Sequence, residues 1–193
     1  MDQKILVFAF PGTGKTFATQ NFENTCDFES LYYIFDYNKD VLHWHIDKHK
    51  GRDDIRVKSP DFPQNYINAI KKELEKGRIV ITPFMINNLI ALEEADFDSE
   101  TRIIVVTHDE NDYETIATRF RNRGNAEDFV ELCREWLPQI NKRVKELQNI
   151  EVVVLSDEKF LTEALVDLGI PLIQGVGVDN YDKKNNGSWE ERK

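Results

Sequence analysis

The sequence predicts an α/β fold in which a five-stranded, mostly parallel sheet carries helices on both faces. Short apolar, β-branched runs alternate along the chain with stretches of helical periodicity, and no segment repeats at the periods of solenoid proteins. Parallel strands need crossover connections, so this alternation favours a sheet covered on both sides. The length of 193 residues suits one domain with a sizeable core.

Five apolar runs are expected as strands, and polar or turn-forming residues flank each of them. They cover residues 5–9, 24–30, 79–82, 103–107 and 152–155. The last three are so rich in β-branched residues that we expect both of their faces to be buried. Residues 171–174 are a candidate for a late edge strand.

Helical periodicity fills the stretches between these strands. It covers residues 15–22, 63–76, 86–95, 126–147 and 158–168. In the second of these, Tyr66, Ile67, Ile70 and Leu74 fall on one face, and Gly77 marks the end. In the longest, Pro138 is expected to kink or divide the helix.

Composition excludes several classes of protein. The net charge of −10 argues against a partner such as long nucleic acid. No apolar run approaches the roughly 20 residues of a membrane span, so we expect no membrane partner. The apolar start of the chain lacks a basic region and ends at Pro11 and Gly12, which favours a buried strand over a secretory signal. Cys26 and Cys133 are interpreted as reduced core residues of a cytoplasmic protein, either a monomer or a homodimer.

A glycine-rich stretch, AFPGTGKT, follows the first strand and opens the first helix. It matches the phosphate-binding pattern GxxxxGK[ST], except that Ala9 stands at the first glycine. Gly12 and Gly14 let backbone N–H groups turn around a phosphate at a helix N-terminus, Lys15 reaches the outer phosphates, and the Thr16 hydroxyl suits Mg²⁺. A ligand-free strand–turn–helix connection is the alternative. The predicted binding residues are Pro11, Gly12, Thr13, Gly14, Lys15 and Thr16, with ATP and Mg²⁺ as cofactors.

With PGTGKT in this position, the chain resembles the adenylate-kinase-like branch of P-loop nucleoside monophosphate kinases. The stretches DFES at 27–30 and SPDFPQNY at 59–66 are similar to small phage-type nucleotide kinases. The resemblance extends from residue 3 to about 172 and implies a three-layer P-loop NTPase fold. Residues 1–178 are expected to form a single kinase-like domain, and the polar residues 179–193 a flexible C-terminal tail.

The resemblance places the phosphoryl acceptor between the second and third strands. Residues 31–77 are therefore expected to form an acceptor-binding helical insertion. Asp27 and Glu29 stand at the carboxyl end of the second strand, where ligands collect in open α/β sheets. One of them would orient water on Mg²⁺ and the other an acceptor hydroxyl; alternatively, both satisfy nearby backbone amides.

Three further groups of residues in this insertion can be interpreted either as functional or as ordinary surface or core residues. The basic residues suit an acceptor phosphate or a solvated loop: Lys48, Lys50, Arg52, Arg56 and Lys58. The aromatic residues suit base stacking or a local core: Tyr32, Tyr33, Phe35, Tyr37 and Trp44. The histidines are candidate metal ligands, since two of them would share a face of a helix, but they show no H-E-x-x-H pattern and no cysteine lies nearby: His43, and the pair His45 and His49.

A cluster of arginines follows the fourth strand, and the resemblance implies a lid-like segment there at residues 117–127. On a helix, Arg119 and Arg123 share one face and Arg121 points away. Guanidinium groups at a closing element suit the charge neutralisation that phosphoryl transfer needs. Pairing with Glu110, Glu114 or Glu127 on an exposed helix is the alternative.

One departure concerns the acid that many relatives carry at the end of a neighbouring strand. Here the third strand ends at Thr82 and Pro83, and the fourth runs into His108 and Asp109. Asp27 or Asp109 would then support Mg²⁺ through water.

The predicted function is ATP-dependent phosphoryl transfer to a small acceptor, a nucleoside or deoxynucleoside monophosphate. The expected catalytic residues are Lys15, Arg119, Arg123, Asp27 and Glu29, and the expected metal ligands are Thr16 and Asp27. A nucleoside or other small-molecule kinase, with Glu29 as base, is one alternative. A non-catalytic nucleotide-binding regulatory module is another.

Overall fold

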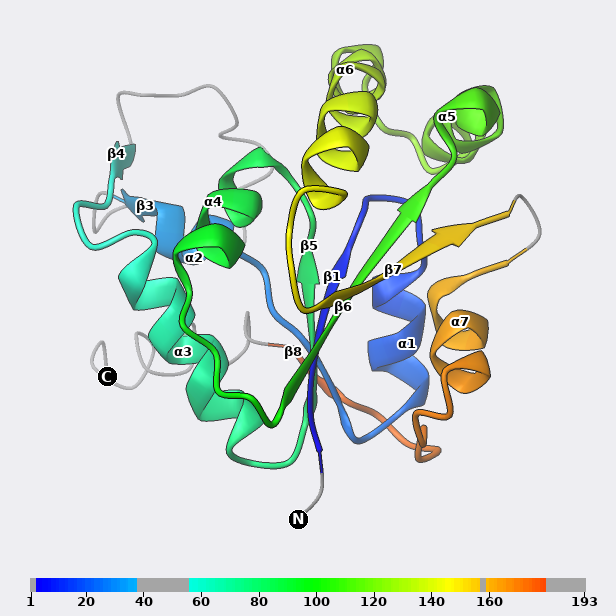
Figure 1. Ribbon diagram of the computed structural model, residues 1–193. Helices are drawn as coiled ribbons and strands as arrows, with labels where there is room; N and C mark the ends of the chain where they lie inside the picture. Colours follow the sequence, from blue (N-terminus) through cyan, green and yellow to red (C-terminus); the bar gives the residue numbers. More distant parts are fainter. Residues whose placement is uncertain (1–2, 38–55, 157–158, 180–193) are drawn as a thin grey trace, which may run out of the picture.

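A parallel sheet forms the centre of the computed structural model, which describes residues 3–37, 56–156 and 159–179 (Figure 1). Its six strands lie in the order β7-β6-β1-β5-β2-β8, and every neighbouring pair is parallel. They are β1 (Lys4–Ala9), β2 (Thr25–Asp27), β5 (Ile79–Pro83), β6 (Thr101–His108), β7 (Ile150–Leu155) and β8 (Val178–Asp179). The five expected strands are thus present, and the two-residue β8 extends the sheet beyond β2.

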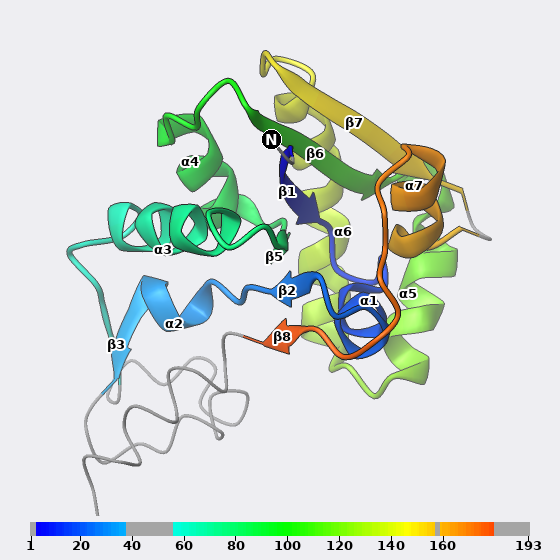
Figure 2. The ribbon, with the colours of Figure 1, turned by 90° about the horizontal axis from the view of Figure 1, so that it is seen from below.

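Helices cover both faces of this sheet, as the alternation of elements predicted. They are α1 (Lys15–Asn21), α2 (Leu31–Ile34), α3 (Gln64–Leu74), α4 (Ile86–Glu94), α5 (Tyr113–Asn122), α6 (Glu127–Val144) and α7 (Leu161–Asp167), with a 3₁₀ turn η2 (Glu110–Asp112). Helices α1 and α7 lie on one face and α3 and α4 on the other (Figures 1 and 2). Core residues of α5 and α6 join the α3–α4 side.

The alternation of side chains along β1 builds two separate cores. Leu6 and Phe8 are buried against α3, α5 and α6, whereas Ile5, Val7 and Ala9 are buried against α1 and α7. A strand buried on both faces needs apolar residues at every position, which explains the unbroken apolar run. Among the helices of the described ranges, none is both long and apolar enough to cross a bilayer.

Strand β7 departs from the expectation of burial on both faces. Val152 and Val154 are 45% and 55% exposed, although Leu155 is buried. The reason is the position of β7 at the edge of the sheet, where it has only β6 as a neighbour. The side chains of Val152 and Val154 are therefore not covered by the helices that pack on the centre of the sheet.

Several expected boundaries are corrected. The second strand is shorter than residues 24–30, because the chain turns at Ser30 into α2. The late edge strand is Val178–Asp179 and not 171–174, where Gln174 makes only an isolated bridge to Phe22. Pro138 does not divide α6, which stays helical from Glu127 to Val144 with this proline on its exposed surface.

The expected insertion at 31–77 is only partly helical in its described portion. After the short α2, strands β3 (Phe35–Tyr37) and β4 (Arg56–Lys58) pair in an antiparallel manner. Helix α3 then packs against the main sheet, because its apolar face of Tyr66, Ile67, Ile70 and Leu74 joins the core there. Residues 38–55 of the insertion and 180–193 of the expected tail lie outside the described residues.

Candidate nucleotide-binding site

The loop between β1 and α1 has the backbone conformation that its glycines predicted. Gly12 and Gly14 have φ angles of 86° and 104°, in the left-handed region that favours glycine. The Phe10 N–H donates to the Val106 carbonyl at 2.9 Å, which ties the start of the loop to β6. Gly14 is the N-cap residue of α1. The loop therefore turns sharply at the carboxyl end of β1 and leads directly into a helix.

Two residues of this loop support its shape with their side chains. The Thr13 side chain is fully buried, and its hydroxyl donates to the Phe10 carbonyl at 2.9 Å. The Leu161 N–H donates to the Thr13 carbonyl at 2.8 Å and fastens the loop to the start of α7. Pro11 is also buried. Of the six predicted binding residues, Pro11 and Thr13 thus shape the loop.

The other loop residues face outward. Lys15 is partly buried and Thr16 is exposed at the start of α1. Within the described residues, no carboxylate forms an ion pair with the Lys15 ammonium. The chain therefore presents a cation and a hydroxyl side by side at the end of β1.

Helix α5 packs directly on the glycine loop. A Cβ atom built on Gly12 would lie 3.1 Å from Cε1 of Phe120, and Phe120 is itself buried. Phe120 also contacts Phe129 edge to face, with ring centroids 5.4 Å apart. Because Ile116 and Ala117 are buried as well, the expected lid-like segment 117–127 begins with a helix that is anchored in the core.

The end of α5 is closed by a glycine motif. The Gly124 N–H donates to the Arg121 carbonyl at 2.9 Å, and the Asn125 N–H donates to the Phe120 carbonyl at 3.1 Å. Gly124 has a φ of 80°, so this is a Schellman end, in which glycine adopts the left-handed conformation. The motif fixes where the helix ends: Asn122 is the last residue of α5, and Arg123 is its C-cap residue.

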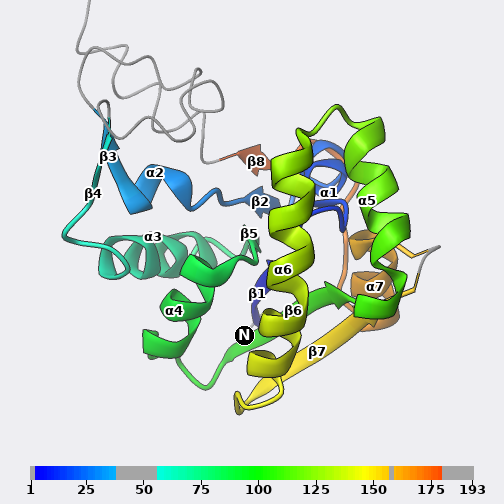
Figure 3. The same ribbon diagram turned by 90° about the horizontal axis from the view of Figure 1, so that it is seen from above.

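A cleft with a volume of about 710 Å³ lies between this loop and the helices that follow β6 and β7. Seen from above, α1, α5 and α7 gather beside the carboxyl ends of β1 and β6 (Figure 3). The cleft is lined by Gly12, Gly14, Phe17, Arg119, Asn122, Arg123, Phe160, Thr162 and Glu163. It is at the point where the connection from β1 crosses toward β2 and the connection from β6 crosses toward β7, which is where ligands bind in open α/β sheets.

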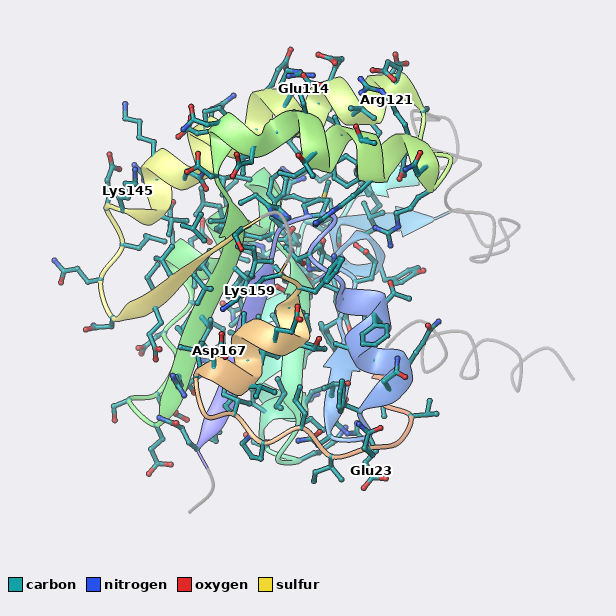
Figure 4. All side chains as sticks on the ribbon, turned by 90° about the vertical axis from the view of Figure 1, so that its right-hand side faces the viewer. Glu23, Glu114, Arg121, Lys145, Lys159 and Asp167 are labelled. Atoms are coloured by element: carbon teal, nitrogen blue, oxygen red, sulfur yellow. The ribbon has the colours of Figure 1, made fainter. Side chains whose placement is uncertain are left out.

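The three arginines take the positions that helical spacing predicts. Arg119 and Arg123 both line the cleft, and the Arg119 guanidinium lies 4.8 Å from the centroid of the Phe160 ring. Arg121 instead forms an ion pair with Glu127 on the outer surface. Figure 4 shows Arg121 and Glu114 on the outer side of α5 and α6, away from the sheet. The surface-pairing alternative therefore describes Arg121.

Sequence reasoning missed the aromatic lining of this cleft. Phe17 is 56% exposed on α1, and Phe160 is 43% exposed at the N-cap of α7. The sequence did contain a signal for Phe17, because this residue directly follows Lys15 and Thr16. Phe160, by contrast, reaches the cleft only because the Leu161 N–H is bonded to the loop.

The two carboxylates at the carboxyl end of β2 lie at different levels along the sheet: Asp27 is the last residue of the strand, and Glu29 follows it. Asp27 pairs with Ile81, which pairs with Val7, so Asp27 is two residues short of the level at which β1 ends. Glu29 follows nearer the carboxyl edge, and its Oε1 accepts hydrogen bonds from the Leu31 N–H at 3.2 Å and from Ser30. Glu29 thus satisfies a neighbouring amide and also stands closer to the edge where ligands collect.

The ends of β5 and β6 carry no acid aimed along the sheet. Thr82 and His108 are buried, and the Asp109 carboxylate accepts from the N–H of Asn111 and caps the 3₁₀ turn η2. Within the described ranges, no group of three or more His, Cys, Asp or Glu side chains is arranged to hold a metal ion.

The structure does not describe the side chains of some residues that the sequence singled out. These are His43, His45, His49, Lys48, Lys50, Arg52, Arg56, Tyr37 and Trp44. Of the basic stretch, Lys58 is described and exposed. Of the aromatic stretch, Tyr33 stacks on Phe28 with ring centroids 5.5 Å apart and belongs to the local core. Cys26 and Cys133 are buried and do not form a disulfide, as expected.

Comparison with known proteins adds no family to this geometry: no protein-family model and no curated protein matches the chain.

Proposed function

We propose that this chain binds ATP and transfers its γ-phosphoryl group to a nucleoside or deoxynucleoside monophosphate. One observation carries the proposal: the glycine loop after β1 and two arginines from the helix after β6 line the same cleft. Phosphoryl transfer depends on positioning and on neutralising charge, and a glycine loop at a helix N-terminus beside Arg119 and Arg123 suits both.

The residues around the loop fit Mg²⁺ through Thr16. Its exposed hydroxyl follows Lys15 directly, as the phosphate-binding pattern requires. Asp27 belongs to β2, two strands away from β1, which is about 10 Å at the usual strand spacing. Asp27 would therefore act on the ion through water. When bound, Mg²⁺ neutralises charge on the β- and γ-phosphate oxygens, and Lys15 contributes to the same task.

The aromatic lining suits the base of the nucleotide. Phe17 and Phe160 expose ring surface in the same cleft as the glycine loop, and nucleotide bases stack on such rings. Arg119 is held on the Phe160 ring, and Arg123 lies one helical turn later at the end of α5. We assign both arginines to the transferring phosphoryl group and the exposed ring of Phe17 to the base.

The acceptor is assigned to the carboxyl end of β2. Glu29 lies nearer that edge than Asp27 and is oriented by the start of α2. A carboxylate there accepts hydrogen bonds from hydroxyl or amino groups of a nucleotide. A monophosphate acceptor needs no strong base, because its phosphate oxygen is already nucleophilic.

One observation favours a second candidate, a nucleotide-binding module that does not transfer phosphate. The strands beside β1 end in Pro83 and His108, and Asp109 caps a turn, so no acid at these positions supports Mg²⁺ directly. Such a module would bind ATP and hydrolyse it slowly, at a rate independent of every acceptor.

An acceptor panel tests the proposal. Wild-type protein is incubated with ATP, Mg²⁺ and each nucleoside or monophosphate, and the products are separated by chromatography. Formation of a nucleoside diphosphate from one monophosphate class supports the proposal, and formation of a monophosphate from a nucleoside identifies the nucleoside kinase alternative. ATP binding in calorimetry without any transfer identifies the module, and the absence of ATP binding refutes all three.

A further inference from the structure

A chain of buried hydrogen bonds lies beneath the turn that follows β2. The Tyr66 hydroxyl, on α3, donates to the Phe28 carbonyl at 3.1 Å. Asn88, on α4, donates from Nδ2 to the Tyr66 hydroxyl at 3.2 Å and accepts at Oδ1 from the Ser30 hydroxyl at 3.3 Å. The three side chains are at most 1% exposed. This chain joins two helices to the turn that carries Glu29.

Polar side chains at such positions are costly unless they are paired. Burial of an unpaired amide or hydroxyl costs more than burial of an apolar group of the same size, whereas a fully satisfied network makes its surroundings rigid. Here Tyr66 both donates and accepts, and Asn88 uses both ends of its amide. The network therefore fixes one orientation of the turn where an apolar core would tolerate several.

Ser30 is the point at which this network meets the carboxylate. Its Oγ is 3.3 Å from Oδ1 of Asn88 and 3.5 Å from Oε1 of Glu29, and a hydroxyl has one hydrogen to share between them. A carboxylate accepts several hydrogen bonds at once, so this contact orients Glu29 while Glu29 still accepts from a ligand.

The pKa of Tyr66 is also affected by the carboxylates at the end of β2. Burial raises the pKa of Tyr66 well above its ordinary value, and the charges of Glu29 and Asp27 raise it further. The phenol therefore keeps its proton at neutral pH and remains a donor to the Phe28 carbonyl.

From this geometry we infer that Tyr66, Asn88 and Ser30 are positioning residues that set the Glu29 carboxylate for the acceptor. The inference rests on the proposed function, in which Glu29 faces the acceptor, and it assigns acceptor affinity to residues of α3 and α4 that touch neither substrate. Binding of ATP, whose cleft is lined by α1, α5 and α7, is independent of this chain.

The test compares two buried tyrosines. Tyr66→Phe removes the hydroxyl from the network, and Tyr113→Phe is the matched control, because Tyr113 is 4% exposed and its hydroxyl donates to the Val130 carbonyl at 2.5 Å. For each variant, kcat and the KM values of the best acceptor and of ATP are measured, with ATP affinity by calorimetry. Tyr66→Phe should raise the acceptor KM about tenfold and change ATP affinity by less than about twofold, whereas Tyr113→Phe should change neither.

Ser30→Ala is a second variant, which breaks the same hydrogen-bond chain at its other end. If Tyr66→Phe does not fold, Ser30→Ala still tests the inference. It should raise the acceptor KM to a similar extent. Because the two residues act through one chain, the double variant should resemble the larger single effect and not their product.

Three results would overturn the inference. The first is equal acceptor KM values for Tyr66→Phe and Tyr113→Phe with Ser30→Ala also unchanged. The second is an equal loss of ATP and acceptor affinity, which would mean a general structural role. The third is a wild-type protein that binds ATP and phosphorylates no acceptor, which would remove the transfer reaction as well. A change in acceptor KM alone would leave the proposed function and the inference standing together.

Discussion

The loop after β1 is held by apolar packing and backbone contacts, whereas the turn after β2 is held by buried side-chain hydrogen bonds. Phe120 and Ile116 pack against Gly12 on the first side. Tyr66 and Asn88 bond the turn through Ser30 and Phe28 on the second. Both regions lie at the carboxyl edge of one sheet, yet they are fixed by different forces.

This difference predicts different sensitivities. Packing against a glycine depends on size, because one added methyl group meets a buried ring. A hydrogen-bond chain depends on direction, because removing one hydroxyl leaves its partners unpaired at nearly constant volume. Changes near Gly12 should therefore affect ATP, and changes near Ser30 should affect the acceptor.

The largest effect is expected for Lys15→Ala. This change removes the cation that we assign to the outer phosphates and should abolish most ATP affinity or turnover without unfolding the protein. Isothermal calorimetry with ATP, together with circular dichroism, measures both. Lys142→Ala, an exposed lysine on α6, is the control and should bind ATP normally. Unchanged ATP binding in Lys15→Ala would show that the loop is a connection and not a phosphate site.

Arg119→Lys and Arg123→Lys should come next. Lysine keeps the charge but loses the planar fork that matches phosphate oxygens. Turnover should fall by about ten- to a thousandfold, the cost of removing a transition-state donor, while ATP affinity changes much less. Arg121→Lys is the control, because Arg121 pairs with Glu127 outside the cleft. Small, equal effects at all three positions in steady-state kinetics would place the whole cluster on a solvated surface.

Gly12→Ala sharpens the role of packing and is compared with Gly77→Ala. Both glycines have positive φ angles, 86° and 73°, at which a side chain costs about 1–2 kcal/mol. A Cβ on Gly77 would have no atom within 4 Å, whereas one on Gly12 would be 3.1 Å from Phe120. Urea denaturation should therefore show a larger loss for Gly12→Ala, and only this variant should weaken ATP binding. Equal losses would leave backbone strain as the sole cause.

The smallest effect is expected for Glu151→Gln, a change on the edge strand β7. Arg102 bonds both oxygens of Glu151 at 2.5 and 2.8 Å, which holds the pKa of Glu151 below its ordinary value. A pKa lowered by folding stabilises the protein at pH values above the ordinary carboxyl pKa, and this stabilisation is lost as the pH falls through the lowered value. Because the pair is partly exposed, Glu151→Gln should cost less than about 1 kcal/mol at pH 7.

Urea denaturation at two pH values checks this sign. The difference between wild type and Glu151→Gln should be measurable at pH 7, and it should shrink as the pH falls below the ordinary carboxyl pKa and then through the lowered pKa of Glu151. At pH 7, the affinities for ATP and for the acceptor should be the same in wild type and in Glu151→Gln. Equal stability of the two proteins at pH 7 would mean that Arg102 is held by its bond to the Leu168 carbonyl and not by the charge of Glu151.

Much of the fold was predictable because its signals are local. The apolar run of β1 and the apolar face of α3 gave their positions to within a few residues, since burial on both faces or on one face sets the spacing of apolar side chains. The prediction that Pro138 could divide its helix was wrong, because a local rule about helix interiors ignores the packing of Val130, Cys133 and Leu137 that holds α6 together. The exposed valines of β7 misled for a related reason: the sequence does not state which strand lies at the edge.

The sequence by itself determined the glycine loop and the shared helical face of Arg119 and Arg123, because both follow from spacing within one turn of chain. Only the tertiary structure decided that these arginines face the loop, that Phe160 joins them, and that Tyr66 and Asn88 reach the turn carrying Glu29. These contacts join residues that are far apart in the sequence, and the order of strands in the sheet brings them together.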